Sequence, residues 1–127
     1  MDANQKIEGF EPKSALKRIE DDQELYLELI EMYLEDAPVL IGDLGVAIKE
    51  QNFEMASLRS HSLKSTSRTV GAEALGELAA QTEQAIRSCD WKTAEALLPE
   101  IKLWFERIRN ILSEIAEAPE ERLQVLL

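Results

Sequence analysis

Apolar residues recur at intervals of three and four along most of this chain, and few segments alternate residue by residue as strands do. The pattern therefore predicts helices. A short one is expected over residues 12–19, where Pro12 suits the start because its missing N–H is not needed there. Together with the longer periodic segments that follow, this short helix indicates an all-α fold. The expected architecture is an antiparallel up-and-down four-helix bundle with a short additional N-terminal helix.

The first long segment begins after Asp21-Asp22, whose charges favour a helix N-terminus, and ends at Gln51-Asn52. Pro38 lies inside it and is expected to kink one continuous helix near residues 36–38, because its ring crowds the preceding turn. The residues expected to face inward are Leu25, Leu29, Met32, Tyr33, Leu40, Leu44, Ala47 and Ile48.

The next two segments are predicted to form an antiparallel hairpin about Gly71, because the linkage between them is short. A last long helix should follow Cys89-Asp90, with Pro99 bending or interrupting it. The inward stripe of the hairpin's first helix, over residues 53–70, consists of Phe53, Ala56, Ser60, Leu63, Ser67 and Val70. The return helix contributes Leu75, Leu78, Ala79, Thr82, Ala85 and Ile86, and the last helix Ala94, Leu97, Leu98, Ile101, Phe105, Ile108, Leu112 and Ile115.

No linker is long enough to divide the chain into two domains. The expected organisation is a flexible N-terminal segment over 1–10, a helical bundle over 11–117 and a C-terminal tail over 118–127. Ile7 and Phe10 are available to pack against the bundle. The apolar end of the tail, Leu123–Leu127, leaves packing, disorder or self-association open, although a bundle of this size is expected to be a monomer.

Composition narrows the class of partner. The chain has 127 residues, of which 45% are hydrophobic, enough for one core. A net charge of −11 argues against nucleic-acid binding and against docking on an anionic membrane, so the expected partner is a protein. Cys89 is the only cysteine, is expected to be a small apolar filler, and fits a reducing compartment. Without a leader-like segment or an apolar stretch of ~20 residues, a cytoplasmic location is expected.

The only histidine, His61, has Lys64 three residues on, so imidazole and ammonium share one helical stripe. A neutral imidazole is a nucleophile, and an adjacent ammonium would steady an anionic group that it carried. His61 is expected to be exposed on the stripe formed by Ser57, His61, Lys64, Ser65 and Arg68. The competing interpretation is an incidental surface histidine.

Glu83 follows from the geometry of the hairpin. It lies twelve residues past Gly71 and His61 lies ten before it, which places the two at similar height. A carboxylate there would fix the imidazole tautomer and leave the other ring nitrogen free. An ordinary surface acid is the alternative.

Other chemistries fit less well. One histidine without a second histidine or nearby cysteine is a poor metal set, so no metal site is expected. Ser65 and its neighbours on one helix cannot build a hydrolytic triad with His61. We find no glycine-rich phosphate loop and no kinase-like signature, and therefore expect no nucleotide site and no cofactor.

The run His61-Ser62-Leu63-Lys64-Ser65-Thr66-Ser67, followed by Gly71-Ala72, Leu75, Leu78 and Glu83, resembles the histidine-containing phosphotransfer (HPt) domain family. The resemblance extends upstream through Asp21–Leu25 and Tyr33–Pro38 and covers residues 11 to about 115. Two positions depart from the family pattern. Ser65 stands where glycine is usual and adds a side chain to the exposed stripe, and Thr82 replaces a common leucine.

The resemblance implies a histidine phosphocarrier of a two-component multistep phosphorelay, which is not itself an enzyme. His61 would be the phosphoacceptor and Lys64 would stabilise the phosphoryl group. The implied partners are response-regulator receiver domains, which would bring their own Mg²⁺, and a hybrid sensor histidine kinase. Docking is expected to use apolar residues near His61 with Arg59, Ser65 and Arg68. The alternative is a non-catalytic helical adaptor in which His61 is not phosphorylated.

Overall fold

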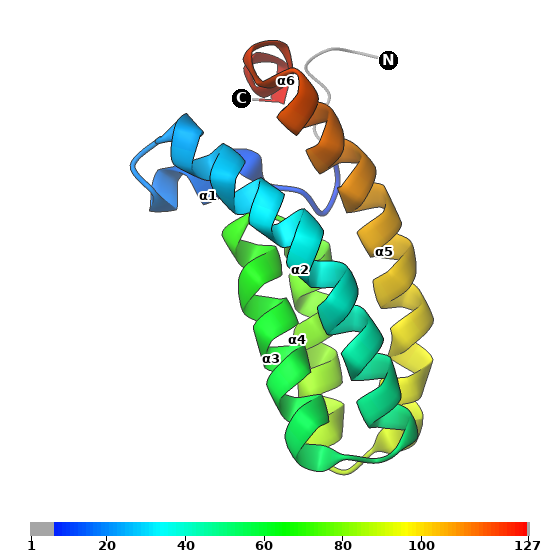
Figure 1. Ribbon diagram of the computed structural model, residues 1–127. Coiled ribbons are helices and arrows are strands. Elements are labelled where there is room, and N and C mark those ends of the chain that lie inside the picture. Colours follow the sequence, from blue (N-terminus) through cyan, green and yellow to red (C-terminus); the bar gives the residue numbers. More distant parts are fainter. Residues whose placement is uncertain (1–6, 127) are drawn as a thin grey trace.

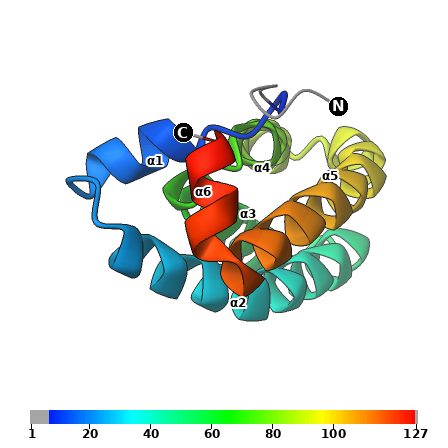
Figure 2. The same cartoon turned by 90° about the horizontal axis from the view of Figure 1, so that it is seen from above.

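The computed structural model describes residues 7–126, and all regular secondary structure in that range is helical. Helices α2 to α5 form an antiparallel four-helix bundle, as predicted (Figure 1). Short helices α1 and α6 lie at one end of it, and α6 crosses that end of the bundle (Figure 2). The bounds are α1 Pro12–Arg18, α2 Gln23–Lys49, α3 Phe53–Thr69, α4 Glu73–Arg87, α5 Trp91–Glu117 and α6 Pro119–Leu126.

The boundaries of the long helices have local chemical causes. At three N-termini a side-chain oxygen accepts a hydrogen bond from a backbone N–H three residues on, which satisfies one unpaired donor of the first turn. These caps are Asp22 for α2, Asn52 for α3 and Asp90 for α5. The turns after α2, α3 and α4 contain left-handed residues, which end a helix. These are Gln51 with φ 52°, Gly71 with φ 88° and Cys89 with φ 55°.

The prolines inside α2 and α5 interrupt neither helix. Pro38 lies within a continuous 27-residue helix, as expected. Pro99 lies within the equally long α5, which runs unbroken. Pro99 falls in the third turn of α5 and is exposed, so the lost hydrogen bond lies at the surface of the bundle.

The face of α2 that enters the core differs from the prediction in its first half. Leu25 is 38% exposed and Met32 57% exposed, whereas Tyr26 and Ile30, which were not expected to face inward, are buried. Tyr33 is buried as predicted. The phenol of Tyr26 donates to the carbonyl of Val70 at 2.8 Å, and that of Tyr33 bonds Ser67 Oγ at 2.8 Å. Both hydroxyl groups therefore keep a hydrogen-bond partner although the rings are buried. Burial raises the pKa of both phenols.

The inner face of α3 is built from small residues, and α3 packs against both α2 and α4. Ala56, Ser60, Leu63 and Ser67 are buried as predicted. Phe53 is not: it stands at the first position of the helix and is 47% exposed, so its prediction was wrong. Ser60 Oγ donates to the carbonyl of Ala56 at 2.8 Å, which removes the cost of burying its hydroxyl.

The segment before α1 is bonded to the turn between α3 and α4. The N–H of Glu11 donates to the carbonyl of Gly71 at 2.7 Å, and the N–H of Ala74 donates to that of Gly9 at 3.1 Å. Phe10 is buried and Ile7 is half-buried against the core. A Cβ at Gly71 would lie 2.6 Å from the carbonyl oxygen of Glu11, so this crossing requires glycine.

Beyond α5, the tail continues as helix α6, and Leu123 is 1% exposed. The side chains of residues 125–127 lie outside the described residues, as do residues 1–6 of the flexible segment expected over 1–10. Cys89 lies just past the end of α4, in the turn before α5, and is exposed, so the expectation that it is a small apolar filler was wrong. Over residues 7–126, no helix has both the length and the apolar character that crossing a lipid bilayer requires.

Candidate functional site

His61 lies at the midpoint of α3, and its side chain is 56% exposed. The helix is held by its inward residues Ala56, Ser60, Leu63 and Ser67, which are all buried. The helical repeat therefore directs His61 away from the core, at the edge of α3 next to α4. A rigid element thus presents an accessible imidazole.

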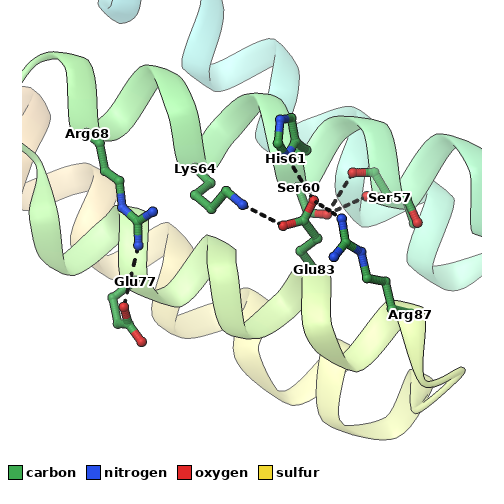
Figure 3. Close-up of polar contacts among 9 residues, drawn as sticks. Ser57, Ser60, His61, Lys64, Arg68, Glu77, Glu83 and Arg87 are labelled. Atoms are coloured by element: carbon green, nitrogen blue, oxygen red, sulfur yellow. Dashed lines mark hydrogen bonds and ion pairs between the residues drawn. The ribbon is translucent and has the colours of Figure 1, made fainter.

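Glu83 on α4 lies opposite His61 and is only 5% exposed. Its Oε2 is 2.9 Å from His61 Nδ1, and its Oε1 is 2.8 Å from Lys64 Nζ (Figure 3). The expected hairpin geometry therefore brings all three side chains together. The interpretation of Glu83 as an ordinary surface acid does not hold, since a buried carboxylate needs partners and here it has them.

Arg87 is a fourth member of the cluster that sequence reasoning missed. Its Nη2 lies 3.4 Å from Glu83 Oε2, and its side chain is 60% exposed. Its spacing of i+4 from Glu83 was the available signal, but such pairs are common on helix surfaces and seldom mark a site. Only the burial of Glu83 sets this pair apart.

Opposing effects act on the ionisation of Glu83. Burial disfavours the charged form and raises the pKa, while hydrogen bonds from Lys64 and His61 lower it, as do the charges of Lys64 and Arg87. Their sum holds the pKa of Glu83 below its usual value of 4.5. Glu83 is therefore a carboxylate at neutral pH.

The ionised carboxylate determines which imidazole nitrogen can react. A carboxylate oxygen only accepts hydrogen bonds, so Nδ1 of His61 carries the proton and donates a hydrogen bond to Glu83. In the neutral ring, the lone pair then lies on Nε2. Attack by Nε2 on an electrophile would leave positive charge on the ring, next to the carboxylate of Glu83.

The three residues expected at the docking surface do not form one continuous rim. Arg59 faces α2, where its Nε lies 3.4 Å from Asp43 Oδ2. Arg68 faces α4, pairing with Glu77 at 3.6 Å, and its stem lies against Gly76. Ser65 is exposed one turn after His61. Leu58, one turn before His61, is an apolar side chain 54% exposed.

Within the described part of the chain, no three His, Cys, Asp or Glu side chains are grouped so that they could hold a metal ion. The cluster around Glu83 contains one carboxylate, one imidazole and two cations. Lysine and arginine are not metal ligands, and their charges disfavour a cation here. The arrangement instead favours a negatively charged group on the accessible face of His61.

The structure is thus a helical bundle that carries an exposed histidine, which is oriented by a buried acid. Sequence comparison identifies the family to which such a chain belongs. The chain belongs to the Hpt domain family, whose model matches residues 28–118. It is similar to the phosphorelay intermediate protein rdeA of Dictyostelium discoideum, with 26% identity over 95 residues. That alignment covers 75% of this chain and 37% of the relative, so the chain spans little more than a third of the relative's length. No solved structure matches the chain significantly.

The matched range contains α3, α4 and the whole His61 cluster. Helix α1, the first turns of α2 and helix α6 lie outside it. The family assignment therefore rests on the bundle and not on the short helices at its end.

Proposed function

We propose that this chain is a histidine phosphocarrier of a multistep phosphorelay. His61 accepts a phosphoryl group from the aspartyl phosphate of a receiver domain and passes it to the aspartate of another. The observation that carries the proposal is the contact of 2.9 Å between His61 Nδ1 and Glu83 Oε2, on an imidazole that is otherwise exposed. Membership of the Hpt domain family and the name of the Dictyostelium relative support it.

In the proposed transfer, the lone pair of Nε2 forms a bond to phosphorus as the bond from phosphorus to the aspartate oxygen breaks. That electron pair returns to the donor as a carboxylate. The proton stays on Nδ1 and keeps its hydrogen bond to Glu83, whose negative charge offsets the positive charge that develops on the ring. Phosphoryl transfer needs alignment and charge stabilisation more than covalent chemistry from the protein, which suits so small a site.

Lys64 is the proposed partner of the phosphoryl oxygens. It lies one turn from His61 on the same helix, and its side chain is 22% exposed. An ammonium is a compact charge with three donors and suits a phosphoryl group. We assign no cofactor to this chain and place the Mg²⁺ of the reaction on the receiver domain, so the protein acts as one half of a composite site and not as an enzyme alone.

The proposed partners are response-regulator receiver domains and, upstream, a hybrid sensor histidine kinase. Docking would use Leu58 and Ser65, which flank His61 on the exposed face of α3, together with Arg68 on the same edge. Arg59 would contribute from the α2 side. Ser65 in place of a smaller residue would influence which receiver fits. The cytoplasm is the proposed location, and the monomer the proposed state.

Transfer from a panel of receiver domains, each phosphorylated with acetyl phosphate and Mg²⁺, tests the proposal. We expect rapid labelling of the wild-type chain, with an adduct that is labile in acid and stable in base. His61→Gln should abolish labelling and leave the helical circular dichroism spectrum unchanged. Labelling that persists in His61→Gln would contradict the assignment, and a folded wild-type chain that no receiver labels would favour the adaptor alternative.

A further inference from the structure

Lys64 has two incompatible tasks in the proposed function. In the structure its ammonium lies 2.8 Å from Glu83 Oε1 and is largely shielded from solvent. Nε2 is the ring nitrogen that does not face Glu83, so drawing the ammonium towards phosphoryl oxygens on Nε2 weakens its pair with that carboxylate. Removing one partner of a buried ion pair is costly, because the remaining charge is left without compensation.

Arg87 lies where it can compensate. It reaches Glu83 from the side opposite Lys64 (Figure 3) and binds Oε2, while Lys64 binds Oε1. It belongs to α4, the helix that carries Glu83, so movement of Lys64 on α3 does not disturb it. Its side chain is 60% exposed, so its charge needs no second partner inside the protein.

We propose that Arg87 is a positioning residue: it keeps Glu83 charged and bonded to His61 Nδ1 when Lys64 moves to the phosphoryl group. This inference rests on the proposed function. The hydrogen bond and ion pair that the structure gives the Arg87 side chain are with Glu83, and Arg87 acts on His61 through that carboxylate.

The charges balance in both states. Before transfer, the carboxylate of Glu83 is shared by Lys64 and Arg87. During transfer, the new N–P bond leaves positive charge on the imidazole ring and places the phosphoryl oxygens on its outer side. Lys64 then pairs with those oxygens, while Glu83 keeps Arg87 and the Nδ1 proton. Without Arg87, the stabilisation of Glu83 and that of the phosphoryl group would compete for one ammonium.

The test uses phosphoramidate, a small donor that phosphorylates imidazoles without a partner protein, so docking plays no part. The rate of phosphohistidine formation is measured for the wild type, Arg87→Gln and Arg109→Gln. Arg109 forms a pair with Glu106 on the surface of α5, at 2.6 Å and three residues apart, and is the matched control. We expect Arg87→Gln to slow the reaction roughly tenfold, the effect of losing a charge-assisted hydrogen bond, and Arg109→Gln to leave it unchanged.

The Glu83→Gln background separates positioning from direct contact. With no charge at position 83, Arg87→Gln should cause no further loss of rate. A wild-type rate for Arg87→Gln would overturn the inference, and so would an equal loss in both backgrounds, which would mean that Arg87 meets the phosphoryl group itself. Arg87→Met is a second charge-neutral variant, and the melting of every variant is followed by circular dichroism. Receiver domains that fail to label the wild type would overturn the proposed function, whatever phosphoramidate shows.

Discussion

Nδ1 of His61 and Oε2 of Glu83 lie 2.9 Å apart, which joins an exposed imidazole of α3 to a buried acid of α4. The contact predicts the site of phosphorylation. Phosphoramidate should label only Nε2 of the wild type, because Nδ1 is occupied. In Glu83→Ala both nitrogens should be labelled, and the rate at Nε2 should fall by about 10–100-fold, as when the partner of a reactive histidine is removed. Phosphorus and nitrogen NMR distinguish the two isomers.

Glu83→Gln is the control for charge. Its amide oxygen can still accept a hydrogen bond from Nδ1–H, so selectivity for Nε2 should persist while the rate falls by less than in Glu83→Ala. A Glu83→Ala variant that still reacted at Nε2 alone would show that the carboxylate does not select the tautomer.

The pKa of Glu83 predicts how stability depends on pH. Because the folded state holds this pKa below 4.5, ionised Glu83 stabilises the fold above that pH, and the contribution is lost as the pH falls further. In urea unfolding, the stability difference between the wild type and Glu83→Gln should therefore shrink in the acid range, because the wild type loses more stability below pH 4.5. The remaining carboxylates are common to both proteins. Parallel curves would contradict the shift.

The hydrogen bond between Tyr33 and Ser67 should contribute measurably to stability. Tyr33→Phe keeps the ring in the core but leaves Ser67 Oγ buried without this partner, which should cost about 1–3 kcal/mol in urea unfolding. Adding Ser67→Ala removes the unpaired hydroxyl and should recover part of the loss. Additive effects of the two substitutions would indicate that the hydroxyls do not interact.

Replacing two of the glycines with alanine should change the stability of the protein in opposite directions. Gly71→Ala places a Cβ 2.6 Å from the carbonyl oxygen of Glu11, at a φ of 88°, and should destabilise the protein by more than about 1 kcal/mol. Gly42→Ala meets no atom within 4 Å in the middle of α2 and should stabilise it by about 0.5–1 kcal/mol. Thermal unfolding of both variants checks the pair, and a stable Gly71→Ala would mean that the N-terminal segment does not cross the turn so closely.

The main helices could be predicted because apolar periodicity and capping residues act locally. In the first half of α2, the burial of Tyr33 was predicted, but the burial of Tyr26 and the exposure of Leu25 and Met32 were not, since both are more apolar than the tyrosines beside them. Burial of the tyrosines depends on hydrogen bonds to residues far away in the chain. The hydroxyl of Tyr26 donates to the carbonyl of Val70, and that of Tyr33 is bonded to Ser67 Oγ. A pattern read along one helix does not contain those partners.

In the site, too, spacing along the chain predicts some residues, while others depend on how the helices pack. His61 and Lys64 are neighbours on one helix, and Glu83 follows from counting outward from the turn at Gly71. The part played by Arg87 depends on how deeply Glu83 is buried, which spacing does not reveal. Similarly, Arg59 is close to His61 in the chain, yet its contact with Asp43 places it on another side of α3.

Because Glu83 occupies Nδ1, the protein offers one reactive atom, on one face of one helix. In the proposed function, two receivers that need Nε2 therefore exclude each other, and the donor has to dissociate before the acceptor binds. Exchange between them should follow ping-pong kinetics, without a ternary complex. The direction of phosphoryl flow would then depend on the concentrations and affinities of the competing receivers, since both would use the same nitrogen atom of His61.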